Sequence, residues 1–178
     1  MRGTVTDSFI PPDPAATSAV PVYRRTDDEQ AYRAGILEVL RLARHEIRIV
    51  DLTLESMGLE SAIAAAAIDA QLATHPGLNL RIALHEPAWL LQRAPRLAAL
   101  RLRAGHRIEV RQMPDHLRHL ADSHLLADGC QGIRRFHQDH ARAAISIDHP
   151  ADIAPWWSRF EALWEECQAL PASEFHGL

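Results

Sequence analysis

The sequence of 178 residues contains no lysine, and all 19 of its basic residues are arginines. This absence excludes the lysine of a Walker-type phosphate loop, a Schiff-base lysine and a lysine that clamps a phosphoryl group. A formal net charge of -4 gives no reason to expect that the whole surface attracts nucleic acid or anionic lipid. A local group of arginines is therefore the feature by which this chain would bind an anion.

Cysteines and long apolar segments are also scarce. Cys130 and Cys167 form no C-x-x-C or zinc-type spacing, so we expect two free thiols in a reducing compartment. The longest apolar run, residues 62–68, is far shorter than the roughly 20 residues that cross a bilayer. No basic region followed by an apolar core marks the N-terminus as a signal peptide. We therefore predict a cytoplasmic location and no contact with a membrane.

Strand-like and helix-like segments alternate along most of the chain. The 47% hydrophobic content is enough for one core. Three segments have the pattern of strands, residues 46–53, 79–85 and 107–112, and segments with helical patterns separate them. This alternation predicts an α/β fold with a mixed, mostly parallel sheet that is flanked by helices on both faces. We expect three regions: a flexible leader over residues 1–21, a single domain over 22–170 and a flexible tail over 171–178.

Residues 116–136 interrupt this alternation. Residues 123–127 predict a strand, Asp128-Gly129 predicts a tight turn, and residues 131–136 predict the returning strand of a β-hairpin. One more strand is expected at residues 143–147, and a last helix from Pro150 to about residue 170. Aromatic residues recur in that helix at spacings of three and four, which predicts that they pack in the core. They are Trp156, Trp157, Phe160 and Trp164.

This order of elements, with the Asp-Gly hairpin and the segment FEALWEE in the last helix, resembles one half of a phospholipase D-like protein over residues 22–168. In that family the strand before the turn carries His-x-Lys-x4-Asp. With Asp128 as the motif aspartate and a weak catalytic candidate, the His position falls on Ala121 and the Lys position on Ser123. The resemblance therefore implies that both catalytic functions are absent. Because the family builds its site from two halves or a dimer, it also implies a homodimer.

Other alignments of the motif do not recover it. His124 as the nucleophile places Leu126 at the Lys position and Gln131 at the Asp position. His119 as the nucleophile requires Ala121 at the Lys position. Leucine and alanine cannot neutralise phosphoryl oxygens, so these two histidines are only weak catalytic candidates.

Histidines also offer candidate metal ligands. His116 and His119 are three residues apart, as are His137 and His140, a spacing that places two imidazoles on one face of a helix. Carboxylates that are close in sequence are Asp115, Asp122 and Asp139. No H-E-x-x-H pattern is present, so these four histidines are weak candidates, and we predict no cofactor.

Three arginines surround the position at which the resemblance places a phosphate. Guanidinium groups of Arg134, Arg135 and Arg142 are suited to bidentate contacts with phosphate or carboxylate. Because neighbouring strand residues point to opposite sides, at most one of Arg134 and Arg135 faces such a pocket. Asp51 and His85 end two expected strands, at the edge where open α/β sheets bind ligands. The alternative for all five residues is that they are ordinary solvent-exposed polar side chains of a hairpin and of loops.

These observations predict a catalytically inactive phospholipase D-like module that binds a protein partner or a second copy of itself. Two other functions stay open: a metal- or His-dependent phosphodiesterase that uses the histidines of residues 116–124, and a binder of single-stranded nucleic acid, which the acidic balance disfavours. The chain also resembles a bacterial domain family of unknown function that is sometimes found beside a GNAT-type acetyltransferase domain. This second resemblance implies an acetyltransferase domain as a companion.

Overall fold

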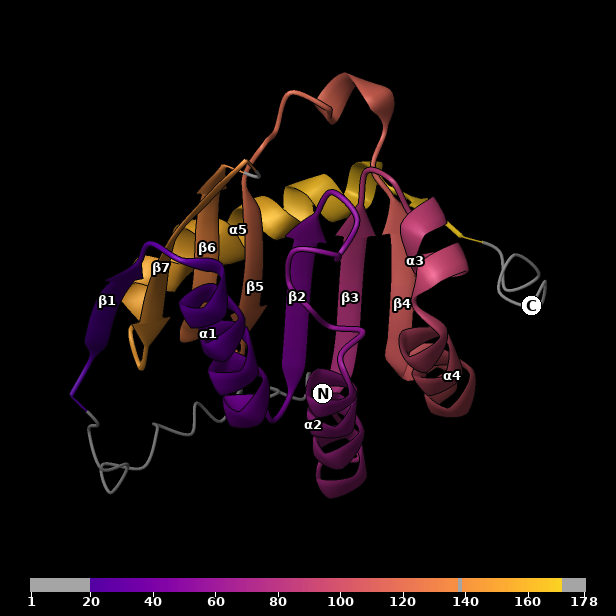
Figure 1. Cartoon of the computed structure of the whole chain (residues 1–178), viewed down its shortest axis with the longest axis horizontal. Helices are drawn as coiled ribbons and strands as arrows, with labels where there is room; N and C mark the ends of the chain where they lie inside the picture. Colours follow the sequence, from indigo (N-terminus) through magenta and orange to yellow (C-terminus); the bar gives the residue numbers. More distant parts are fainter. Residues whose placement is uncertain (1–19, 138, 171–178) are drawn as a thin grey trace, which may run out of the picture.

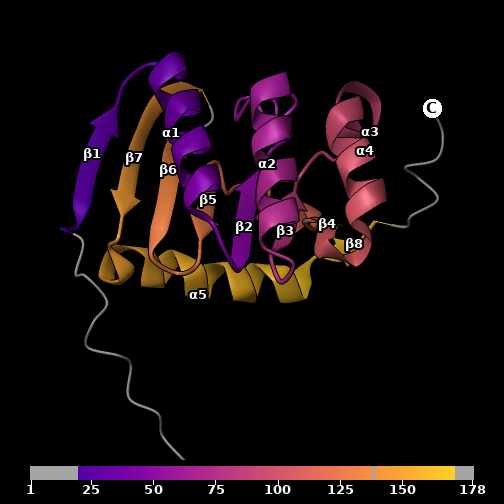
Figure 2. The ribbon, with the colours of Figure 1, turned by 90° about the horizontal axis from the view of Figure 1, so that it is seen from below.

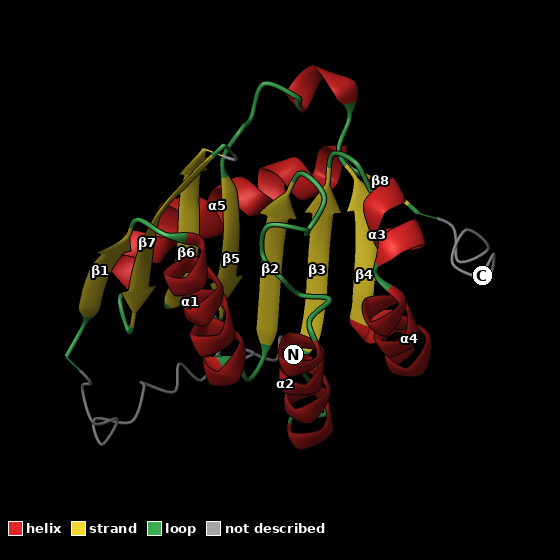
Figure 3. Ribbon diagram, viewed as in Figure 1, coloured by secondary structure: helices red, strands yellow, loops and turns green. Residues whose placement is uncertain are grey.

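A computed structural model describes residues 20–137 and 139–170. Within this part of the chain the strands form one sheet, in the order β1-β7-β6-β5-β2-β3-β4-β8 (Figure 1 and Figure 3). The strands are β1 (Val22–Thr26), β2 (Glu46–Asp51), β3 (Asn79–Leu84), β4 (Ile108–Gln112), β5 (Ser123–Ala127), β6 (Gln131–His137), β7 (His140–Ile147) and β8 (Gln168–Ala169).

Helices cover both faces of this sheet. Figure 2 shows α1, α2 and α4 on one side, and α5 running alone across the other side. The helices are α1 (Glu29–Leu42), α2 (Ala62–Thr74), α3 (Ala88–Arg93), α4 (Pro95–Ala104) and α5 (Pro150–Glu166), with short 3-10 turns at Gly105–Arg107 and Asp115–Leu117. No helix in the described ranges is long and apolar enough to cross a membrane.

The predicted α/β class and the mixed sheet between helices are confirmed, but the parallel part is smaller than expected. Only β2 with β3 and β3 with β4 pair in parallel; the other five pairings are antiparallel. The reason is the hairpin, because β5 joins β2 in antiparallel orientation and β6, β7 and β1 follow it to the sheet edge. The predicted leader up to residue 19 and the predicted tail of 171–178 lie outside the described residues.

The two faces of the sheet are packed by different chemistry. Facing α1 and α2, residues such as Ile47, Ile49 and Ile133 are almost completely buried and form a conventional apolar core. Facing α5, apolar residues such as Val50 share the surface with arginines. Burying this second face therefore requires partners for charged groups.

The aromatic residues of α5 supply these partners. Phe160 and Trp164 are buried as predicted, whereas Trp156 and Trp157 are only partly buried. Guanidinium groups of the sheet lie over these rings, a favourable cation–π arrangement. The distances from guanidinium carbon to ring centre are 3.6 Å for Arg48 and Trp157, 5.5 Å for Arg81 and Phe160, and 4.3 Å for Arg111 and Trp164.

Candidate functional site

The two residues at the His and Lys positions of the resembled motif are Ala121, two residues before β5, and Ser123, the first residue of β5; we call them the motif position. Ser123 is 2% exposed. Its register partner on β6 is Arg135, whose guanidinium donates to both carboxylate oxygens of Glu29, at 3.1 and 2.6 Å. Arg135 Nε also donates to the carbonyl of His140 at 2.8 Å. The cation in register with Ser123 is thus held by groups of the chain itself.

The motif aspartate has a structural place in the hairpin turn. Asp128 has φ 54°, a left-handed conformation that aspartate tolerates better than most residues. Its carboxylate accepts hydrogen bonds from the backbone N–H groups of Arg44, His45 and Glu46, at 2.8, 2.9 and 2.9 Å. This carboxylate therefore joins the turn after β5 to the segment that leads into β2.

His124 is fully buried on the α5 face of the sheet. Its two ring nitrogens make no hydrogen bond, and the nearest carboxylate, that of Asp122, lies 3.9 Å from Nδ1. Asp122 is itself held by two hydrogen bonds from Arg159, at 2.9 and 3.1 Å. Burial lowers the pKa of His124, against the opposing effect of Asp122. A nucleophilic imidazole must reach its substrate, and this ring is 0% exposed.

The burial of His124 should make stability depend on pH. A histidine with a lowered folded-state pKa takes up its proton on unfolding, so stability falls as pH drops below the unfolded value of about 6.5. We expect His124→Leu to reduce this slope between pH 7 and 5 by up to about 1.4 kcal/mol per pH unit. Urea unfolding of both proteins at several pH values measures it, and equal slopes would contradict the buried neutral state.

Asp51 and His85 do not form the rim of an open pocket. Asp51 is 3% exposed, and its Oδ2 accepts a hydrogen bond from the backbone N–H of Leu54 at 2.6 Å. This contact supports the left-handed φ of 80° at Leu54, where the chain turns away from the sheet. His85 is 5% exposed, and burial lowers its pKa. Both side chains are covered by the loops that follow β2 and by the segment before β5.

The histidine pairs do not assemble a metal site. His137 and His140 are cross-strand partners on β6 and β7, so the prediction that they share a helical face is wrong. His116 Nε2 lies 2.9 Å from a carboxylate oxygen of Glu166, and His119 Nδ1 lies 2.9 Å from the carbonyl oxygen of His116. Across residues 20–137 and 139–170, no three histidine, cysteine or acidic side chains are grouped in a way that would hold a metal ion.

The structure separates the three candidate arginines of the hairpin region. As expected, Arg134 and Arg135 point to opposite sides, because Arg135 meets α1 and Arg134 meets α5. The guanidinium carbon of Arg134 lies 3.8 Å from the ring centre of Trp156 and 4.9 Å from that of Phe136. Arg142 is exposed on β7. Arg134 lines a pocket together with Trp156, whereas Arg142 lines a different one.

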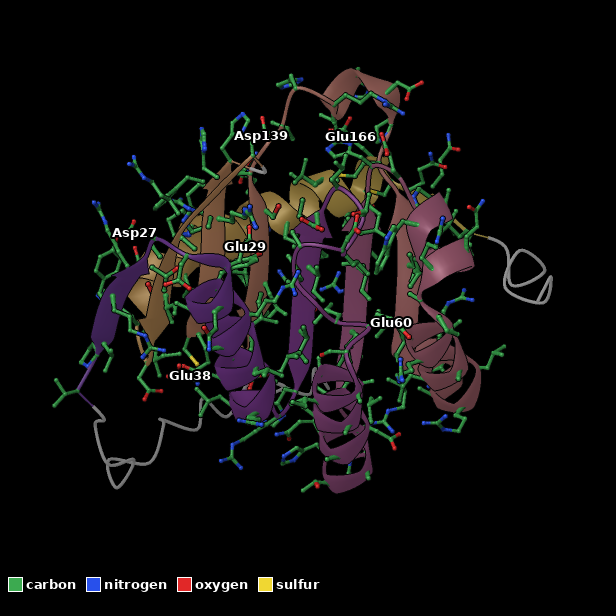
Figure 4. All side chains as sticks on the ribbon, in the orientation of Figure 1. Asp27, Glu29, Glu38, Glu60, Asp139 and Glu166 are labelled. Atoms are coloured by element: carbon green, nitrogen blue, oxygen red, sulfur yellow. The ribbon has the colours of Figure 1, made fainter. Side chains whose placement is uncertain are left out.

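An open hollow at the corner of the sheet was not anticipated from the sequence. We call it the corner hollow; its volume is about 480 Å³, and it is lined by Arg25, Thr26, Asp27, Phe136, Arg142 and Ala143. Figure 4 shows Asp27 at the junction of β1 and α1, and Glu29 at the start of α1. Sequence patterns indicated Arg142 but neither Arg25 nor this neighbourhood, because it depends on the antiparallel pairing of β1 with β7, more than 100 residues away.

Solved structures show which class of fold this is. The fold is similar to that of a phospholipase D family member, Nuc from Salmonella typhimurium, with TM-score 0.58 and 16% identity over 85% of this chain and 99% of that one. NucT from Helicobacter pylori gives TM-score 0.56 and 11% identity over 85% and 100%. TrmBL2, an archaeal chromatin protein, gives TM-score 0.59 and 17% identity over 83% of this chain and 54%, about half, of that one. The fold is therefore phospholipase D-like.

The family is shown by the sequence. The family model described as "Domain of unknown function (DUF7931)" matches residues 28–178, and the chain belongs to this family. No curated protein sequence matches the chain. The match covers α1 and every later element, including the hairpin, but begins after β1.

Proposed function

We propose that this chain is a catalytically inactive phospholipase D-like module that acts by binding a protein partner or a second copy of itself. The observation that carries the proposal is the motif position, where Ala121 and Ser123 supply neither the imidazole nor the cation of the motif. Arg135, the cation next to it, is already bound by Glu29. We further propose that it works in the bacterial cytoplasm, for which the two free thiols are the support, with an acetyltransferase domain as one companion.

The rival phosphodiesterase function has less support. It requires an accessible nucleophile, and His124 is enclosed beneath α5. His119 lies on an exposed loop, but the residue two positions later, where the motif has its phosphate-binding lysine, is Ala121. Nucleic-acid binding is a second candidate. Its support is the pair of arginines at the corner hollow. The similarity to TrmBL2 adds no support, because DNA binding is a property of that protein and a shared fold does not transfer it.

Hydrolysis of a chromogenic phosphodiester, bis(p-nitrophenyl) phosphate, tests the proposed inactivity. We expect purified chain to give no turnover above His124→Ala, with or without a chelator, because alanine replaces the motif imidazole and the hydroxyl of Ser123 is on a residue only 2% exposed. A phospholipase D family member such as Nuc, assayed in parallel, checks the conditions. Turnover that is lost in His124→Ala would overturn the proposal, and sensitivity to the chelator would then indicate a metal. Light scattering distinguishes a second copy from a different partner, since only the former gives a dimer mass.

A further inference from the structure

The corner hollow has the size and the open shape of a site for a small ligand. Its volume of about 480 Å³ lies within the range of about 300–1,000 Å³ that is usual for such sites. It lies where β1 ends and where β6 and β7 approach their connecting turn. Thr26 of the hollow and Ser123 of the motif position lie in one row of cross-strand partners, Thr26, Ala143, Arg135 and Ser123. The two ends of this row are three strands apart, roughly 14 Å at the usual strand spacing.

Two of the residues that line the corner hollow are arginines without a direct ion pair. Arg25 and Arg142 are exposed and make no direct ion pair with any residue in the described ranges; the Nε of Arg25 donates to the hydroxyl of Tyr23 at 3.4 Å, and Tyr23 and the nearby Asp27 raise the pKa of Arg25. Other arginines near this edge differ, because Arg24 is paired with Glu38 and Arg135 with Glu29. Two guanidinium groups at one hollow repel each other, and a bound anion would offset this repulsion by attracting both of them.

Thr26 lines the corner hollow, but its side chain lies on the α1 face of the sheet, in register with Ala143 and Arg135. Thr26 is 9% exposed, and its Oγ1 is buried without a hydrogen-bond partner. The groups that a phosphate in the hollow can reach are therefore the exposed guanidinium groups of Arg25 and Arg142, which are suited to bidentate contacts with phosphate.

The remaining wall of the corner hollow includes an aromatic ring. Phe136 is 39% exposed; the guanidinium carbon of Arg134 lies 4.9 Å from its ring centre, and the exposed part of the ring offers a surface for stacking. Asp27 adds one carboxylate, which accepts hydrogen bonds from amino or hydroxyl groups. Two cations and one carboxylate leave a net charge of about +1, which matches a single phosphate better than a polyphosphate.

We propose that the corner hollow binds a nucleoside monophosphate group, either as a free nucleotide or as the phosphorylated end of a nucleic-acid strand. Arg25 and Arg142 hold the phosphate, and Phe136 stacks on the base. This assignment goes beyond the proposed binding of a protein partner or a second copy, because it gives the module a site for a small ligand. It uses a different surface from the motif position, so it does not depend on whether that position is inactive.

Calorimetric titration of the full chain with AMP, adenosine and inorganic phosphate tests the proposal. We expect AMP to bind more tightly than either part alone, and Arg25→Gln and Arg142→Gln each to weaken AMP about tenfold, as loss of a charge-assisted contact does. Arg93→Gln, which removes an equal charge from an exposed position on α3, is the matched control and should leave affinity unchanged. Phe136→Leu should weaken AMP but not inorganic phosphate.

Oligonucleotides with and without a 5′ phosphate distinguish the two sources. Tighter binding of the phosphorylated strand than of AMP would assign the site to strand ends, and the reverse would assign it to free nucleotides. Equal losses in Arg142→Gln and Arg93→Gln, or no binding of AMP and the phosphorylated strand at millimolar concentration, would each overturn the proposal, as would binding of both strands with equal affinity and tighter than AMP. Phosphodiester turnover with intact AMP binding would overturn only the proposed inactivity.

Discussion

Replacing Asp128 by alanine should lower the free energy of unfolding by about 3–5 kcal/mol, because hydrogen bonds to a charged group contribute about 1.5–3 kcal/mol each and are not additive. The Asp128 carboxylate accepts three backbone N–H groups, from Arg44, His45 and Glu46. Alanine also tolerates the left-handed φ of 54° less well than aspartate. Urea unfolding followed by circular dichroism measures the loss.

Asp128→Asn is the matched control. Asparagine keeps one side-chain oxygen as acceptor and tolerates the left-handed conformation, but it loses the charge and the second acceptor. We expect about half the destabilisation of Asp128→Ala. A loss below about 1 kcal/mol in Asp128→Ala would show that the turn does not depend on this carboxylate, since that is the value of an ordinary neutral hydrogen bond.

Local patterns were sufficient for the hairpin. The strand before Asp128, the turn and the returning strand are adjacent in sequence, so their pairing follows from turn chemistry alone. The alternation of Arg134 and Arg135 to opposite faces was predictable for the same reason. The number of parallel strand pairings could not be predicted in this way, because it depends on which strands that are distant in sequence become neighbours, as β1 and β7 do.

The partners of the candidate residues could not be read from the sequence. Glu29 and Arg135 are 106 residues apart, and no local signal links them. Each also has an ordinary local reading, Glu29 as an acid in the first turn of a helix and Arg135 as a polar strand residue. Only the packing of α1 on the sheet shows that one side chain neutralises the other, which decides whether Arg135 is free for a ligand.

Arg48 illustrates a limit of a different kind. The mostly apolar segment 46–53 predicts a strand buried on both faces, and Arg48 is an exception within it. The structure buries this arginine to 4% exposure under α5. A tryptophan-rich helix later in the chain is the signal that could have predicted this arrangement, since aromatic faces are favourable partners for guanidinium groups.

Replacing Arg48 by alanine should lower the free energy of unfolding by about 3–5 kcal/mol, because it removes the packing of a large buried side chain together with charge-assisted hydrogen bonds worth about 1.5–3 kcal/mol each, which are not additive. The Arg48 guanidinium donates to the carbonyl of Trp157 at 2.8 Å and to the carboxylates of Glu46 and Glu161, and its carbon lies 3.6 Å from the Trp157 ring centre. Its loss leaves two carboxylates that share Arg81 alone. Urea unfolding measures the effect.

Two further variants separate charge from packing. Arg48→Met keeps an unbranched side chain against Trp157 but removes the charge and the hydrogen bonds, so it should recover only the part of the loss due to packing. Arg24→Ala removes an arginine from the exposed pair with Glu38 and should cost less than about 1 kcal/mol, as surface ion pairs do. If Arg48→Ala cost no more than Arg24→Ala, the arginines beneath α5 would not hold that helix to the sheet. The apolar contacts of Phe160 and Trp164 would then have to do so.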